Sequence, residues 1–114
     1  MGDKKEYLVV FVTVDGMNTA NKISEYVVSN SLAACVNIIQ GVTSVYSWKN
    51  EIARDKEFLL IMKTRKELFK ALEQEIIRLH PYEVPEIIGM DVAKGHVKYL
   101  DWIDRVTCQK PKKK

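Results

Sequence analysis

Two long extended segments on either side of a short polar turn constrain this chain more than any other feature. Residues 34–48 and 52–64 are rich in β-branched and aromatic side chains, and the polar residues 49–51 between them suit a hairpin turn. An arm of about 13 residues at about 3.3 Å each reaches roughly 43 Å, whereas a compact domain of this length has a radius of gyration near 13 Å, on the order given by chain-length scaling. The hairpin must therefore bend sharply or extend beyond its own globule, and Gly41 marks the expected bulge or bend.

The segment before this hairpin predicts one strand and one helix. Residues 7–14 (YLVVFVTV) are apolar with little alternation, which is typical of a strand buried on both faces. Residues 19–30 carry apolar side chains at helical spacing, with Asn18 as the expected N-cap.

The segment after the hairpin predicts a second helix, a fourth strand and a final helix. Thr64 and Glu67 have the spacing of a capping box that would start the second helix. This helix must stop near His80, because the following proline disfavours helical geometry in the residue before it. Residues 86–92 predict a strand, and apolar positions within 99–106 predict the inner face of the last helix.

The resulting order predicts an α+β fold. It is a ferredoxin-like βαββαβ sandwich with an extra C-terminal helix and a long hairpin between the second and third strands. Two helices cover one sheet face, yet residues 8–12 and 58–62 are apolar at consecutive positions, so something must also cover the second face. The charged residues 54–57 suit a solvated part of the hairpin, while the opposite arm, with Tyr46 and Trp48, is apolar enough to dock on a neighbour. We predict an obligate homo-oligomer.

Composition narrows the class of protein. The 114 residues are 46% apolar and 29% charged, which fits one globular domain, residues 7–107, between an N-terminal extension of residues 1–6 and a basic tail of residues 108–114. Four of the 18 cations lie in that tail, so the body is nearly neutral and no nucleic-acid partner is expected. The longest apolar run is five residues, which excludes membrane insertion through a spanning helix. The N-terminus lacks a secretory pattern, so we expect a cytoplasmic protein.

No motif of a common enzyme class is present. The chain lacks a Gly-rich phosphate loop, an HExxH pair and a GxSxG elbow, so we predict that it is not an enzyme and needs no organic cofactor. Its two cysteines, Cys35 and Cys108, form no CxxC pair and support neither a disulfide scaffold nor a zinc ribbon.

Isolated residues remain as candidates for a site, each with a simpler structural reading. The loop from His80 to Glu86 holds an imidazole, a phenol and two carboxylates between two prolines, or it only steers the chain into the next strand. Cys35 is a small buried hydrophobe or, as a thiolate, a ligand for copper or zinc together with His80 of the same or an adjacent chain. Lys63 faces a cleft for an anion or protects an edge strand, and Trp102 lines a pocket or an interface.

Several of these segments together resemble a known family. The motifs are LAACVNII at 32–39, GVTSVYSW at 41–48, KT at 63–64, HPYEVPEII at 80–88 and YLDWI at 99–103. In this order they closely resemble the CutA family of divalent-cation tolerance proteins, over nearly the whole chain. Gln40 stands where the family pattern usually has proline, which alters the expected bend before Gly41.

The resemblance implies a homotrimer similar in architecture to the PII signalling proteins, with the long hairpins paired across subunits. It also implies tolerance of copper and other divalent cations, with metal bound near Cys35 and His80. Our first hypothesis is a trimer that binds Cu²⁺ or another divalent ion weakly through these two residues, supported by Glu83. The second is a PII-like signalling or small-ligand module that uses the intersubunit cleft, and the third is a structural scaffold trimer. The predicted cleft residues are Lys63, Tyr82, Glu86 and Trp102.

Overall fold

The computed structural model describes residues 5–108 and places every expected element. In chain order these are β1 (Tyr7–Val14), α1 (Met17–Ser29), β2 (Cys35–Trp48), β3 (Glu51–Arg65), a 3₁₀ turn (Lys66–Leu68), α2 (Phe69–Leu79), β4 (Ile87–Asp91) and α3 (Val97–Thr107). Residues 1–4 and 109–114, which hold most of the predicted N-terminal extension and basic tail, lie outside the described residues. Within residues 5–108, no helix is long and apolar enough to span a bilayer.

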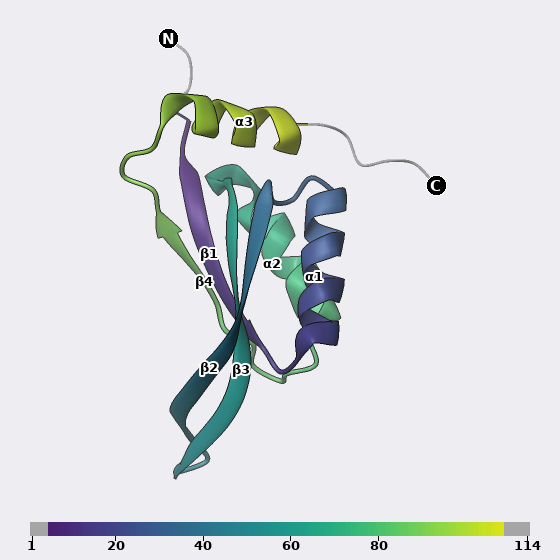
Figure 1. The fold of residues 1–114 in the computed structure, drawn as a ribbon, viewed down its shortest axis with the longest axis vertical. Coiled ribbons are helices and arrows are strands. Elements are labelled where there is room, and N and C mark those ends of the chain that lie inside the picture. The colour runs from purple at the N-terminus through teal and green to yellow at the C-terminus, as the bar shows by residue number, and fades with distance from the viewer. Residues whose placement is uncertain (1–4, 109–114) are drawn as a thin grey trace.

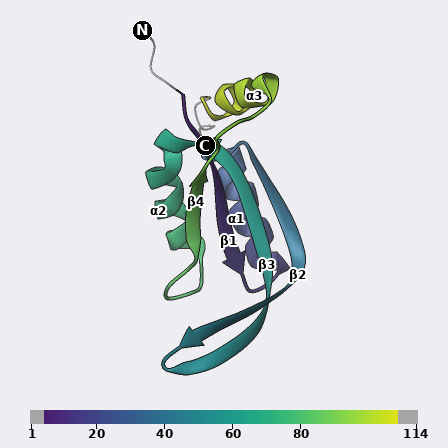
Figure 2. The ribbon, with the colours of Figure 1, turned by 90° about the vertical axis from the view of Figure 1, so that its left-hand side faces the viewer.

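The strands form one antiparallel sheet in the order β2-β3-β1-β4. Helices α1 and α2 pack side by side on one face of this sheet (Figure 1). The third helix, α3, lies across one end of the sheet, where Ile103 packs against Tyr7 and Ala34 (Figure 2). This arrangement confirms the ferredoxin-like α+β prediction, with α3 as the extra C-terminal helix.

Alternation along the strands assigns each side chain to one of two sheet faces. Val10, Val12 and Val14 of β1 are fully buried beneath α1 and α2, in one cluster with Ile23 and Ile76. Burying aliphatic side chains of this size stabilises the fold by about 1.5–3 kcal/mol each.

The other sheet face, which we call the open face, carries the side chains that alternate with this core. It includes Phe11 of β1, Ile39 of β2, and Ile88 and Met90 of β4. Ile88 and Met90 are 52% and 53% exposed. Within the described chain the open face therefore carries apolar side chains that no helix covers over most of its area. This is the uncovered second sheet face that the sequence predicts.

The hairpin of β2 and β3 both bends and extends beyond the domain. Lys49 and Asn50, with φ of 51° and 68°, form a two-residue turn whose twist matches the flanking strands. Gly41, at φ +86°, lies at a register shift between Ile39 and Val42, which confirms the predicted bulge. The radius of gyration is 15.1 Å, above the value of about 13 Å for a compact chain of this length. Figure 2 shows the projecting arm curving toward the side on which β4 lies.

Two predicted helix caps are wrong. The N-cap of α1 is Gly16 rather than Asn18, because the helix already begins at Met17. Thr64 does not start α2: it is a fully buried residue of β3, and its hydroxyl donates to the Leu32 carbonyl at 2.7 Å. A side chain facing the core in this way is not free to cap a helix, and the chain enters α2 through the 3₁₀ turn instead.

Candidate functional site

Cys35 lies at the start of β2, on the open face, opposite Lys63 of β3. The Lys63 ammonium donates to the Asn37 side-chain oxygen, and its nitrogen lies 3.9 Å from the Cys35 sulfur. On the other side, burial and the neighbouring Cys35 sulfur raise the pKa of Tyr99. Tyr99 in turn packs on Trp102, with ring centroids 5.5 Å apart. Lys63 and Tyr99 therefore lie beside Cys35, and Trp102 packs on Tyr99.

His80 follows the last residue of α2 and is buried, with both ring nitrogens engaged. Nδ1 accepts a hydrogen bond from the Tyr82 backbone N–H at 3.2 Å, and Nε2 lies 2.8 Å from the Thr13 carbonyl oxygen. Because Nδ1 is the acceptor, Nε2 must carry the proton that Thr13 receives. The imidazole is therefore neutral and fixes the loop after α2 against the end of β1.

The structure does not bring Cys35 and His80 together in one chain. Cys35 pairs with Lys63 of β3, and Lys63 pairs with Val9 of β1, so Cys35 lies at the level of Val9 along the sheet. His80, in contrast, lies at the level of Thr13, whose carbonyl it contacts. Four residues along a strand separate the two positions by about 13 Å. Among residues 5–108, no group of three or more His, Cys, Asp and Glu side chains is arranged to hold a metal ion. Glu83 lies on the same loop as His80 and is exposed. A metal site that uses Cys35, His80 and Glu83 does not fit a single chain.

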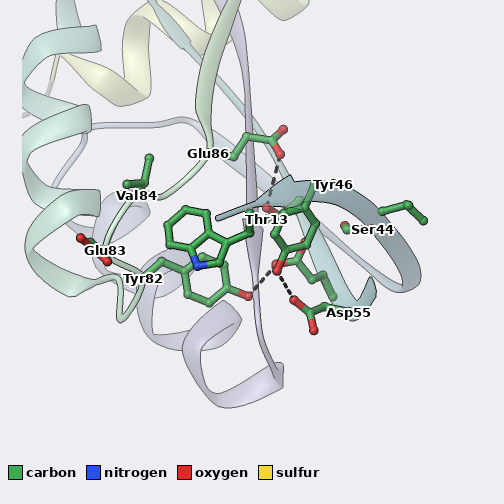
Figure 3. A pocket seen from close by; sticks show the side chains of 11 residues that line it. Thr13, Ser44, Tyr46, Asp55, Tyr82, Glu83, Val84 and Glu86 are labelled. Atoms are coloured by element: carbon green, nitrogen blue, oxygen red, sulfur yellow. Dashed lines mark hydrogen bonds between the residues drawn. The ribbon is translucent and has the colours of Figure 1, made fainter. Parts of the chain in front are cut away.

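A pocket of about 600 Å³ opens between the projecting hairpin, the end of β1 and the loop before β4 (Figure 3). We call it the acidic aromatic pocket. Its acidic side chains come from β3 and from the loop, and its aromatic side chains come from β2 and the loop. They are the carboxylates Asp55, Glu57, Glu83 and Glu86 and the rings of Tyr46, Trp48 and Tyr82. Of the predicted cleft residues, Tyr82 and Glu86 lie here, while Lys63 lies beside Cys35 and Trp102 packs on Tyr99.

Hydrogen bonds between these side chains hold the pocket in shape. The Tyr82 hydroxyl donates to Glu57 Oε2 at 2.5 Å, and the Tyr46 hydroxyl donates to Asp55. Figure 3 shows both tyrosine hydroxyls reaching toward the centre of the pocket. Burial, followed by the hydrogen bond to Glu57, raises the pKa of Tyr82. The hydrogen bond to Asp55 raises the pKa of Tyr46. Both phenols are therefore held in their neutral, donating form.

His80 positions this arrangement without lining the pocket. Its ring packs on the Tyr82 ring, with centroids 4.5 Å apart, and its Nδ1 holds the Tyr82 backbone. At the other end of the loop, Glu86 accepts a hydrogen bond from the Thr13 hydroxyl at 3.4 Å. Thr13 therefore fixes both ends of the loop, through its carbonyl and its hydroxyl.

Comparison with known proteins identifies the family of this chain. A family model described as CutA1 divalent ion tolerance protein matches residues 8–106. The chain belongs to the CutA1 divalent ion tolerance family. A Thermus thermophilus relative named divalent-cation tolerance protein CutA is 44% identical over 95 residues, which cover 83% of this chain and 92% of the relative. Human protein CutA is 43% identical over 97 residues, which cover 85% of this chain and 54% of the relative. This chain thus spans just over half of the human and plant CutA proteins that it matches.

Solved CutA1 structures share the fold. The divalent cation tolerance protein from Thermus thermophilus superposes with a TM-score of 0.84 at 43% identity, covering 85% of this chain and 94% of that one. CutA1 from a psychrotrophic Shewanella superposes with a TM-score of 0.87 at 37% identity, covering 96% of this chain and all of that one. The family resemblance inferred from the sequence motifs is therefore confirmed.

Sequence reasoning missed the β3 side of the pocket in this CutA1 family member. We expected residues 54–57 to be solvated, but this is wrong for Glu57, which is only 6% exposed. Asp55 and Glu57 are two residues apart on a strand, so they point to the same face as Ser44 and Tyr46 on β2. That spacing was the available signal. The loop that covers Glu57 lies 25 residues further along the chain, at Tyr82, and no local pattern indicates such a contact.

Proposed function

We propose that this CutA1 family member is a homotrimer that acts in divalent-cation tolerance by binding copper or a related divalent ion weakly. The observation that carries the proposal is the family match over residues 8–106, with a relative named for divalent-cation tolerance at 44% identity. The role is binding rather than catalysis. We place it in the cytoplasm, since Cys35 and Cys108 are free thiols that suit a reducing compartment.

The proposed metal ligands are Cys35, His80 and Glu83, contributed by two subunits. A thiolate, an imidazole and a carboxylate form a mixed set that favours copper and zinc. Cys35 and His80 lie far apart within one chain. We therefore propose that the Cys35 thiol of one subunit meets the His80 loop of its neighbour. His80 can offer Nδ1 by giving up only the Tyr82 N–H bond, while Nε2–H keeps its bond to Thr13.

Calorimetry with Cu²⁺ tests these ligands. We expect Cys35→Ser and His80→Ala each to weaken copper binding, and Glu83→Gln to weaken it less. Cys108→Ser is the matched control, because it removes an exposed thiol away from the proposed site. Equal copper affinity in the wild type and all these variants would end the assignment.

The trimer is supported by what the single chain leaves open. Strands β2 and β4 are the two edges of the sheet, so each presents unpaired backbone groups. The open face beside them carries exposed Ile39, Ile88 and Met90. Pairing between the edges of neighbouring subunits would satisfy the backbone and cover these side chains. Sedimentation should show a trimer, and thermal scans should show a melting temperature that falls on strong dilution. A stable folded monomer would contradict the proposed trimer.

A second candidate function, a small-ligand module, is favoured by the acidic aromatic pocket, which contains Tyr82 and Glu86. A thermal-shift screen with carboxylates, nucleotides and amines tests it. Ligand binding to the folded state raises the melting temperature, and no shift with any class would reject this function. If the role is purely structural, the wild type should bind neither copper nor any ligand of the screen, and substitutions at the proposed metal ligands or in the pocket should change no binding.

A further inference from the structure

The last part of the chain concentrates positive charge. Residues 92–114 hold seven Lys and Arg but only two carboxylates, whereas residues 1–91 hold eleven Lys and Arg and thirteen carboxylates. One of the two carboxylates, Asp104, is buried and accepts a hydrogen bond from the Tyr7 hydroxyl at 2.7 Å. The excess of cations in this protein therefore lies in the loop before α3, on α3 and in the segment that follows it.

Helix α3 turns one face to the sheet and a charged face to solvent. Ile103 and Thr107, on the inner face, are buried. Lys98, Asp101 and Arg105 are three and four residues apart, so they share the other face of the helix, and all three are exposed. The proposed contacts between subunits use the sheet edges and the open face, whereas α3 lies across the end of the sheet away from the projecting hairpin (Figure 1). We call the exposed face of α3 the basic face.

Nearby carboxylates do not compensate this charge. Asp91 already pairs with Lys66 at 3.3 Å, and Asp104 with Lys5 at 3.4 Å. The three cations at 94, 98 and 105 form no ion pair within residues 5–108. In the sequence, α3 is followed by four more lysines, which are Lys110, Lys112, Lys113 and Lys114. The basic face is thus continued along the chain by further positive charge.

This combination favours a lipid surface over a nucleic acid. Clusters of about four to eight Lys and Arg on or beside an amphipathic helix bind anionic lipid headgroups. Proteins that bind single-stranded nucleic acids array aromatic rings among the cations, so that bases can stack on them. On α3, Tyr99 and Trp102 instead pack on each other, with centroids 5.5 Å apart. Val97, beside Lys98, is 67% exposed, and an apolar side chain among cations suits the boundary between headgroups and acyl chains.

We propose that the basic face of α3, together with the lysine-rich segment after it, binds the surface of an anionic phospholipid bilayer. Lys98, Arg105 and the lysines of residues 110–114 contact headgroup phosphates, and Val97 lies at the headgroup level. The association is electrostatic and therefore reversible by salt. It goes beyond the proposed role in cation tolerance and is independent of metal binding at Cys35.

Cosedimentation with vesicles tests the proposal. We expect the protein to sediment with phosphatidylcholine vesicles that contain phosphatidylglycerol, and not with vesicles of phosphatidylcholine alone. NaCl at about 1 M should abolish binding, because the Debye length then falls to about 3 Å. Lys98→Gln should weaken binding about fivefold, which is the contribution of one cation near an anionic surface. Lys22→Gln is the matched control, since it removes an exposed lysine from α1, and it should leave binding unchanged.

The segment after α3 is tested by a combined variant. Lys112→Gln, Lys113→Gln and Lys114→Gln together should weaken vesicle binding about a hundredfold, if each charge contributes as Lys98 does. Circular dichroism establishes that every variant is folded.

Four results would overturn the proposal. The first is that the folded wild type does not sediment with anionic vesicles at low salt. The second is equal binding to neutral vesicles. The third is a Lys98→Gln variant that binds no more weakly than Lys22→Gln. The fourth is displacement from the vesicles by single-stranded RNA at an equal phosphate concentration, because the basic face would then be a nucleic-acid site. The copper titrations of the Cys35→Ser variant are a separate measurement, so failure of the metal proposal leaves these outcomes intact.

Discussion

Removing the Tyr82 hydroxyl tests whether Glu57 is a buried charge that depends on one donor. The bond is 2.5 Å long and ends on a carboxylate that is 6% exposed. A hydrogen bond to a charged group contributes about 1.5–3 kcal/mol, and its loss leaves the acceptor unsatisfied. We therefore expect Tyr82→Phe to lower the free energy of unfolding by about 2 kcal/mol. In a Glu57→Gln background the same change removes only a neutral hydrogen bond, worth about 0.5–1.5 kcal/mol.

Urea unfolding followed by circular dichroism, at one fixed protein concentration, measures both costs. The concentration must be fixed because subunit association adds to the apparent stability. Tyr46→Phe is the matched control: it removes the same hydroxyl from an exposed pair with Asp55, where we expect a cost below about 1 kcal/mol. A double-mutant cycle should give a coupling of about 1 kcal/mol between Tyr82 and Glu57. A Tyr82→Phe cost no larger than that of Tyr46→Phe, or no coupling, would refute the reasoning.

Other parts of the structure give further predictions. Ile88→Lys, on the open face, should dissociate the proposed trimer in sedimentation equilibrium, whereas Ile77→Lys, on the similarly exposed outer face of α2, should not. Gly41→Ala should destabilise the protein by about 1–2 kcal/mol in urea, because φ is +86° there, while Gly16→Ala, at an extended φ of −173°, should cost less, since it adds no backbone strain and only weakens the N-cap of α1. Burial and a hydrogen-bonded carboxylate raise the pKa of Tyr7 to about 12. The unfolded phenol ionises first on going above pH 10, so stability should fall between about pH 10 and 12, and Tyr7→Phe should flatten this alkaline slope in pH-dependent melting.

The features of the candidate site that depend on neighbouring residues could be predicted from the sequence, and those that depend on contacts between distant segments could not. Cys35 was assigned to the sheet face opposite Val36 from alternation alone, and the structure agrees. The His80 loop was recognised as a group of donors held by prolines, but its hydrogen bonds to Thr13 join residues 67 and 73 positions apart in the chain. Sequence placed Lys63 and Trp102 with Tyr82 in an intersubunit cleft. Within one chain, register sets Lys63 beside Cys35 at the other end of the sheet from the Tyr82 loop, so that cleft stays a prediction about the assembled subunits.

The sequence by itself determined the elements, their order, the bulge at Gly41 and the surplus of apolar sheet. These follow from periodicity, from proline and glycine, and from strand length, which act over a few neighbouring residues. Only the tertiary structure decided that Glu57 is buried and that the hairpin, the end of β1 and the loop at Tyr82 enclose one pocket. The physical reason is that the curvature of the hairpin brings distant carboxylates and rings together, and a contact between distant segments leaves no period in the sequence.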